Sequence, residues 1–124
     1  MTAPNIVNVS TITGKTDQYA LSSTNQTTIL NNAASSGKVF KVNMIQAANV
    51  DGSNACDITV NVHSADDGAG TAFSLVSTVS VPADASLVVL DKSTAVYLEE
   101  DMSITATAGT ANDIAIVVSY EEIS

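Results

Sequence analysis

A two-residue alternation of apolar and polar side chains constrains the fold of this chain more than any other feature. In the segment ACDITVNVH (55–63), the even-numbered residues from Cys56 to Val62 are apolar and the odd-numbered residues from Asp57 to His63 are polar. Alternation places the two sets on opposite faces of an extended strand. An α-helix would need apolar residues three and four positions apart, and no stretch shows a convincing stripe of that kind. The chain is therefore predicted to be built from β-strands.

Similar apolar runs recur along the sequence, with Gly, Asn, Asp and Pro between them as turn signals. They lie at 5–13, 27–30, 38–50, 55–63, 71–81, 86–91, 95–98, 102–108 and 113–120. Eight or nine short strands at this spacing predict an all-β fold, an antiparallel β-sandwich of jelly-roll-like topology. The order in which the strands pair does not follow from the runs themselves.

The alternation also predicts which side chains face the core. In 38–50, Phe40, Val42 and Met44 would share one face. In the last two runs the inward residues would be Met102, Ile104, Ala106, Ala108, Ile114, Ile116, Val118 and Tyr120. Tyr97 and Leu98 are expected to anchor the acidic turn that follows them to the sandwich.

Length and composition favour one domain with an aliphatic core. The 124 residues match the usual size of a single core, and 45% of them are hydrophobic. Only 4% are aromatic and none is tryptophan, so Val, Ile, Leu and Ala must fill the interior. We expect one β-sandwich over 1–124, with 1–13 as a candidate intersubunit arm or edge strand.

Charge argues against two classes of partner. Thirteen acidic residues face four lysines and no arginine, which gives a net charge of −9. Nucleic-acid binding needs clustered basic side chains, and an anionic membrane would repel this chain for the same reason. No apolar run reaches the roughly 20 residues of a membrane-spanning helix, and the first ten residues lack a secretory pattern. We therefore expect neither a nucleic acid nor a membrane as partner.

The residues of known catalytic sites are nearly absent. A nucleophilic triad needs a histidine base, and His63 is the only histidine. The alternation sends Cys56 into the core and leaves His63 on the polar, exposed face beside Asp66 and Asp67. One inward cysteine and one histidine do not make a zinc site. The sequence predicts no enzyme and no cofactor.

Calcium is the better-founded ligand hypothesis, because loops rich in Asp and Asn can supply the six to eight oxygens that it needs. The candidate ligands are Asp51, Asn54, Asp57, Asp66 and Asp67. The same residue types form tight turns without metal, and we favour that interpretation. The triplet Glu99, Glu100 and Asp101 is likewise interpreted as a solvated turn between two strands.

The C-terminal third carries a resemblance to a known protein type. The segments VPADASLVVLDKSTAVYLEEDMSITATAG (81–109) and DIAIVVSYEEIS (113–124) resemble small virion proteins of tailed bacteriophages, especially marine ones. The shared motifs are a VPA-x-x-x-L entry, a YLEE-x-x-S turn and a VSYEEI ending. The segments APNIVNVSTITGKT (3–16) and NNAASSGKVFKVN (31–43) are similar as well. The type usually has Gly after the two glutamates, where Asp101 stands here.

The resemblance implies a non-enzymatic component of the virion, most concretely a capsid decoration or accessory protein. Its expected partners are the major capsid protein or other virion proteins. It would stabilise the particle by docking on the shell as a homo-oligomer. Threefold positions on capsids favour a trimer, although no residue pattern specifies that number. Ile6, Val7, Val9 and Ile12 are the candidate interface residues.

Two alternatives stay open at the level of the sequence. One is an accessory protein of the phage neck, tail or fibre, because the resemblance does not distinguish these locations. The other is a calcium-dependent soluble binding module of the adhesin type.

Overall fold

The computed structural model describes residues 6–124, and these residues are folded almost entirely into strands. The strands are β1 (Ile12–Ala20), β2 (Thr27–Asn32), β3 (Val39–Asn49), β4 (Cys56–His63), β5 (Ala72–Val81), β6 (Ser86–Leu90), β7 (Val96–Leu98), β8 (Met102–Ala108) and β9 (Ile114–Ile123). Two single turns of 3-10 helix, η1 (Asp66–Gly68) and η2 (Lys92–Thr94), complete the elements. The predicted all-β fold is confirmed.

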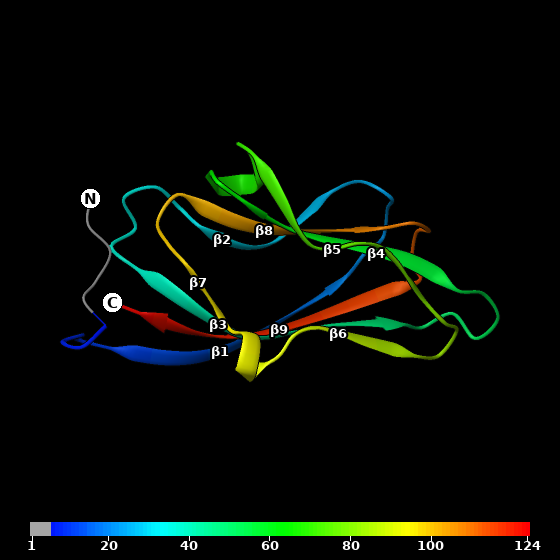
Figure 1. The fold of residues 1–124 in the computed structure, drawn as a ribbon, viewed down its shortest axis with the longest axis horizontal. Helices are drawn as coiled ribbons and strands as arrows, with labels where there is room; N and C mark the ends of the chain where they lie inside the picture. Colours follow the sequence, from blue (N-terminus) through cyan, green and yellow to red (C-terminus); the bar gives the residue numbers. More distant parts are fainter. Residues whose placement is uncertain (1–5) are drawn as a thin grey trace.

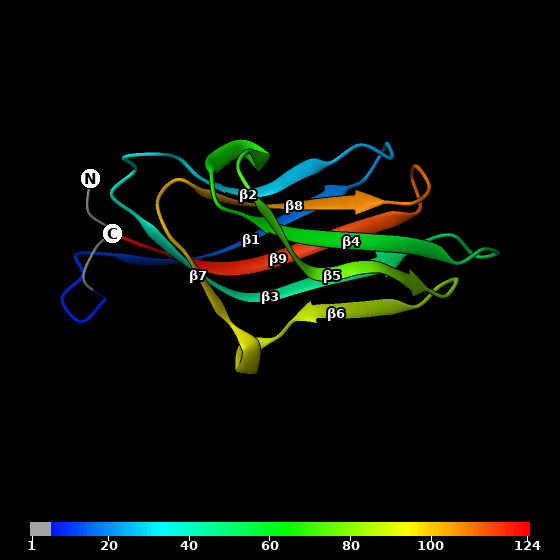
Figure 2. The same cartoon turned by 45° about the horizontal axis from the view of Figure 1, so that its top comes forward.

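The strands form two antiparallel sheets packed face to face (Figure 1). Sheet A has the order β1-β9-β3-β6, with β7 also paired to β3; sheet B has the order β2-β8-β4-β5. Except at β4–β5 and β6–β7, each connection carries the chain from one sheet to the other, as Figure 2 shows. A five-stranded and a four-stranded sheet connected in this order form a jelly-roll-like sandwich, as expected.

The space between the sheets is filled by aliphatic side chains. On β9 the predicted inward residues Ile114, Ile116, Val118 and Tyr120 are all buried, as are Ile104, Ala106 and Ala108 on β8; Met102 is half-buried. Burial of a large aliphatic side chain contributes about 1.5–3 kcal/mol. The core therefore needs few aromatic rings.

A β-bulge in β3 corrects the face predicted for one residue. Val42 pairs with Tyr120 and Met44 pairs with Ser119, so Asn43 is an extra residue in the ladder. One extra residue reverses the alternation beyond it. Ile45 therefore enters the core with no exposed surface. Met44, predicted to share a face with Phe40 and Val42, lies half-buried on the other face.

The first predicted strand is also misplaced. The described residues of the run 5–13 begin as turns, and β1 starts only at Ile12 and continues through Gly14 and Lys15, where a break was expected. Nine uninterrupted pairs with β9, from Ile12–Ile123 to Ala20–Ala115, hold β1 in place. Pairing with a long neighbour outweighs the weak strand propensity of Gly and Lys.

Two buried asparagines join the sheets at opposite ends of the sandwich. Asn49 of sheet A donates hydrogen bonds to Val81 O of sheet B and to Asn54 O, both at 2.9 Å, and accepts one from Asp51 N at 2.9 Å. Asn32 of sheet B donates to Leu98 O of sheet A at 3.0 Å and to Lys38 O at 2.9 Å. Each amide thus satisfies backbone groups where the ladder hydrogen bonds end.

We predict that Asn49→Ala lowers the free energy of unfolding by about 2–3 kcal/mol, because it leaves buried backbone groups without partners. Asn54→Ala removes an exposed amide from the same turn and should change stability by less than about 0.5 kcal/mol. Urea denaturation of both variants measures the difference. Equal stability of the two would contradict the bridging role of Asn49.

Candidate interaction surfaces

The part of the chain that the structure describes contains no enclosed site. Residues 6–124 form no pocket, and no group of three or more His, Cys, Asp or Glu side chains among them is arranged to hold a metal ion. None of their helices is long and apolar enough to cross a membrane. The surfaces themselves are therefore the candidates for function.

The five candidate calcium ligands lie in separate places. Asp51 and Asn54 share the turn after β3, where the Asp51 carboxylate accepts hydrogen bonds from Ser53 N at 2.8 Å and from the Asn54 amide at 3.4 Å. These hydrogen bonds lower the pKa of Asp51, and the one from Ser53 N has the largest effect. Asp57 is exposed at the start of β4, while Asp66 and Asp67 lie in η1, beyond its other end. The structure does not bring the five together.

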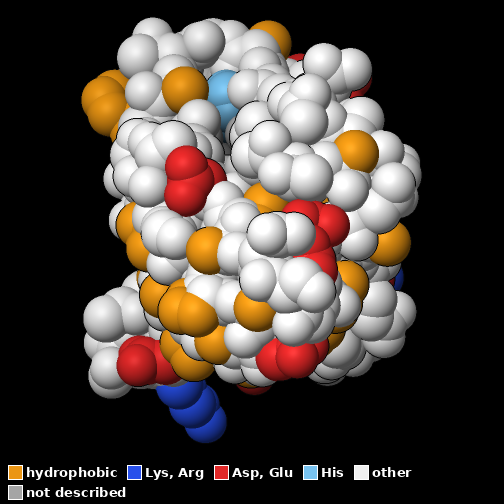
Figure 3. Space-filling view, turned by 90° about the vertical axis from the view of Figure 1, so that its right-hand side faces the viewer, with side chains coloured by type: hydrophobic (Ala, Val, Ile, Leu, Met, Phe, Trp, Pro, Cys, Tyr) orange, Lys and Arg blue, Asp and Glu red, His pale blue; other side chains and the backbone are white. Residues whose placement is uncertain are grey.

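Two acids that sequence reasoning missed lie near Asp51. Asp84 N donates to Asp51 O at 3.1 Å, and burial followed by the charge of Asp51 raises the pKa of Asp113. Three turns far apart in sequence meet at this end of the sandwich, and Figure 3 shows acidic side chains spread over it. Only the pairing of the strands brings these turns together, so no local pattern could have identified them.

His63 is buried, which corrects the expectation of an exposed histidine. It keeps the predicted outward direction on sheet B, but only 3% of its surface is accessible. The loop containing η1 folds over this part of β4 and β8: Gly68 N donates to Ser103 Oγ at 2.8 Å, and Ser103 Oγ donates to Ala65 O at 2.9 Å. Beneath it, a ring nitrogen of His63 lies 2.8 Å from Thr105 Oγ1.

The acidic triplet forms the turn by which the chain crosses from β7 in sheet A to β8 in sheet B. Glu99 and Asp101 are exposed and Glu100 is half-buried. Leu98 anchors the turn with no exposed surface, as predicted, but Tyr97 is 46% exposed and the prediction for it was wrong. Asp101 also accepts a hydrogen bond from Asp66 N at 3.1 Å, which ties this turn to η1.

The backbone at Asp101 has a conformation that glycine adopts more readily than other residues. Its φ is 60°, in the left-handed region that glycine adopts freely and Asp tolerates better than most residues. We predict that Asp101→Ala lowers the free energy of unfolding by about 1 kcal/mol through backbone strain. Asp101→Gly removes the same carboxylate without the strain and should stay closer to the original stability. If thermal melts show that the Gly variant loses as much as the Ala variant, the lost contact with Asp66 is the cause.

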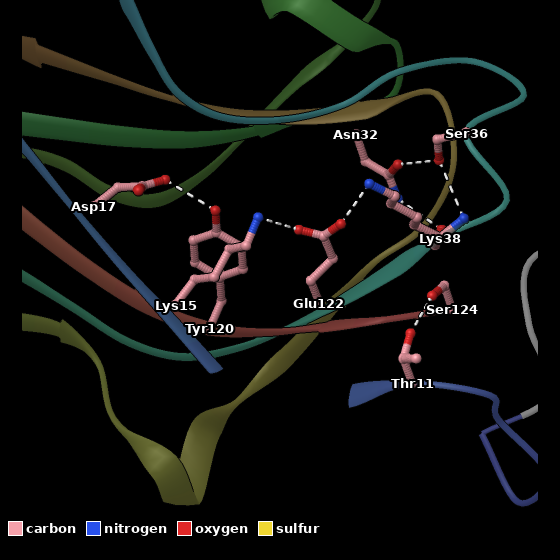
Figure 4. Close-up of polar contacts among 9 residues, drawn as sticks. All are labelled: Thr11, Lys15, Asp17, Asn32, Ser36, Lys38, Tyr120, Glu122 and Ser124. Carbon is pink, nitrogen blue, oxygen red and sulfur yellow. Dashed lines mark hydrogen bonds and ion pairs between the residues drawn. The ribbon is translucent and has the colours of Figure 1, made fainter. Parts of the chain in front are cut away.

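A cluster of ion pairs closes the end of the sandwich where β9 finishes (Figure 4). One carboxylate oxygen of Glu122, in β9, forms an ion pair with Lys15 Nζ of β1 at 2.6 Å. The other oxygen forms an ion pair with Lys38 Nζ, in the loop between β2 and β3. These two lysines lower the pKa of Glu122, and Glu122 raises that of Lys15. Beside them, Tyr120 Oη donates to Asp17 Oδ2 at 2.9 Å. The cluster fixes the inward-facing polar side chains of β1.

We predict that Glu122→Gln lowers the melting temperature by a few degrees at neutral pH. A carboxyl group whose pKa falls on folding stabilises the fold above its ordinary pKa of 4.5, and this contribution disappears as pH falls through the lower folded value. The difference from the unsubstituted chain should therefore vanish in acid. Glu121→Gln is the control, because that carboxylate accepts only the Asn43 amide at 3.4 Å. A pH-independent difference would contradict this account.

The four predicted interface residues lie in and before β1. Ile6, Val7 and Ile12 are 50%, 90% and 56% exposed, and Val9 is half-buried. Ser10 N and Thr11 N both donate to Ser124 O, at 2.8 and 3.0 Å, so this segment is attached to the end of β9. Residues 1–5 of the expected arm lie outside the described residues.

The outer face of sheet A is a further candidate surface. Strand alternation places there Ile12, Gly14, Thr16, Gln18, Ala20, Val39, Lys41, Met44, Gln46, Ala48, Ser86, Val88, Tyr97, Ala115, Val117, Ser119, Glu121 and Ile123. Of these, Val39 and Ile123 are buried, at 4% and 5% exposure. Its charged residues, Lys41 and Glu121, are direct neighbours in the ladder and sum to zero. None of the strands within residues 6–124 packs on this face (Figure 1). A chain of net charge −9 therefore presents a broad neutral face.

Comparisons with known proteins add no family. No protein-family model matches the chain, and no curated protein matches it in sequence.

Proposed function

We propose that this chain is a non-enzymatic structural protein of a tailed-bacteriophage virion, most concretely a decoration protein that docks on the capsid shell. The observation in the structure that supports docking is the neutral outer face of sheet A. A jelly roll supports many functions, so the fold alone decides nothing. The resemblance of the VPA, YLEE and VSYEEI segments to small virion proteins is what selects this class among them.

Docking would use the outer face of sheet A against the shell. A surface with one Lys–Glu pair and mostly small or apolar side chains can be buried without stranding several charges, and an unpaired buried charge is costly. The acidic turns at the ends of the sandwich would then lie around the contact, where basic groups of the shell can meet them. Binding that is available only to the assembled shell stabilises it by mass action.

Two variants test the docking face. Val88 is 55% exposed on the outer face of sheet A, whereas Ser80 is exposed and paired with Asp57 on the outer face of sheet B. We predict that Val88→Glu weakens co-sedimentation with particles lacking this protein by about tenfold or more, which corresponds to about 1.4 kcal/mol. Ser80→Glu adds the same charge to the other face and should bind as the unsubstituted chain does.

The same co-sedimentation is carried out separately with purified phage heads and with purified phage tails. Binding to heads alone supports a decoration protein, and binding to tails or necks alone replaces it with an accessory protein at that location. Absence of binding to both would overturn the proposal. Equal binding by the two glutamate variants would overturn the choice of face.

A further inference from the structure

The outer edge of β1 is a regular strand edge, and the other described sheet edges are interrupted. Its nine pairs with β9 run without a register shift. By contrast, β2 has one shift and β5 has two, and Thr78 in β5 has a φ of 49°. β6 has five residues, follows Pro82 and pairs with a shift. Bulges and short strands protect edges from pairing with other chains, and β1 has neither device.

The hydrogen-bonding pattern identifies the free backbone groups of β1. Thr11 and Ser124 exchange two bonds of 3.0 Å, and Leu21 N bonds to Ile114 O at 2.9 Å. In an antiparallel ladder such pairs alternate, so the odd-numbered residues of β1 bond to β9. The even-numbered residues from Ile12 to Ala20 direct their N–H and C=O groups away from it, and no described strand pairs with them. None of these five residues is a proline or carries a charge.

We propose that two copies of this chain pair antiparallel through β1, about a twofold axis at Thr16. Thr16 then pairs with Thr16 of the second copy, Gly14 with Gln18, and Ile12 with Ala20. Five pairs with two bonds each supply about ten backbone hydrogen bonds between the copies. Sheet A of one copy continues into sheet A of the other.

The charges of Lys15 and Asp17 favour this register, and they favour a second copy of the same chain as the partner. With the axis at Thr16, Lys15 of each copy stands opposite Asp17 of the other, on the inner side of the joined sheet. Directly opposed unlike charges stabilise a strand pair and like charges destabilise it. Moving the axis to residue 15 would oppose two lysines, and moving it to residue 17 would oppose two aspartates. The edge is therefore complementary to itself in one centred register.

The side chains that make this match are already held in place. Lys15 Nζ forms an ion pair with Glu122 at 2.6 Å, and the Asp17 carboxylate accepts a hydrogen bond from Tyr120 Oη at 2.9 Å. The Lys15 side chain is still 44% exposed, so its ammonium group can reach a second carboxylate. Preorganisation of this kind reduces the entropy lost on association.

This contact goes beyond the proposed function, because it depends on the edge of β1 and not on what the outer face of sheet A binds. The paired copies would present two such faces side by side as one continuous surface.

Cross-linking of matched cysteine variants tests the register. In the proposed dimer the two Thr16 Cα atoms lie about 5.5 Å apart, within the range of about 4.4–6.8 Å that a disulfide spans. The two Gln18 residues lie about 13 Å apart or more, because each pairs with residue 14 of the other copy. We predict that Thr16→Cys forms a disulfide dimer at least about tenfold faster than Gln18→Cys under mild oxidation. Cys56 is 2% exposed and common to both variants.

Sedimentation of two further variants tests the edge itself. Thr16→Pro removes an outward N–H without removing a bond to β9, and edge strands accept proline at such positions. It should remain monomeric where the unsubstituted chain and Thr16→Ala are dimers. A chain that is monomeric throughout its soluble range overturns the proposal, as do equal cross-linking rates for the two cysteine variants. If Thr16→Pro fails to fold, the cysteine pair decides alone.

Discussion

Backbone pairing along β9 fixes the positions of the other strands of sheet A. This strand pairs with β1 over nine residues and with β3 over ten, so it lies inside the sheet for its whole length. Its inward residues are aliphatic until Tyr120, whose ring lies 5.3 Å from that of Phe40. Beyond Tyr120 the inward row ends in a charged residue, Glu122. Its ion pairs with Lys15 and Lys38 therefore close the core at that end.

Much of the fold could be predicted from local alternation, and its failures have physical causes outside any local window. The inward residues of β8 and β9 were predictable because both strands are regular. Met44 was assigned to the wrong face because a bulge opposite Ser119 cannot be seen in the sequence of one strand. His63 was given the right direction but the wrong exposure, because the loop that covers it follows β4 and returns over its end. The start of β1 was misplaced because its partner lies more than a hundred residues away.

The candidate surfaces were less predictable than the fold. The sequence identified Ile12 as a candidate interface residue, but the free edge of β1 depends on which residues bond to β9, and that follows only from the register. The neutrality of the outer face of sheet A has the same origin. Most of the acidic residues lie in turns or next to them, and Lys41 and Glu121 become neighbours only through strand pairing. Counting charges along the chain gives the net value but not its distribution over faces.

The hydrogen bond from Tyr120 to Asp17 makes one phenol group a reporter of the attachment of β1. Burial, and then the bond to Asp17, raise the pKa of Tyr120, so the fold opposes its ionisation. The stabilisation is complete below the ordinary pKa of a tyrosine and is lost as pH rises through the folded value. Because the chain has no tryptophan, the ultraviolet absorbance of tyrosinate is not masked. With Tyr19 and Tyr97 replaced by Phe, an optical titration in alkali would therefore follow the Tyr120 phenol and the loss of its hydrogen bond to Asp17 of the edge strand.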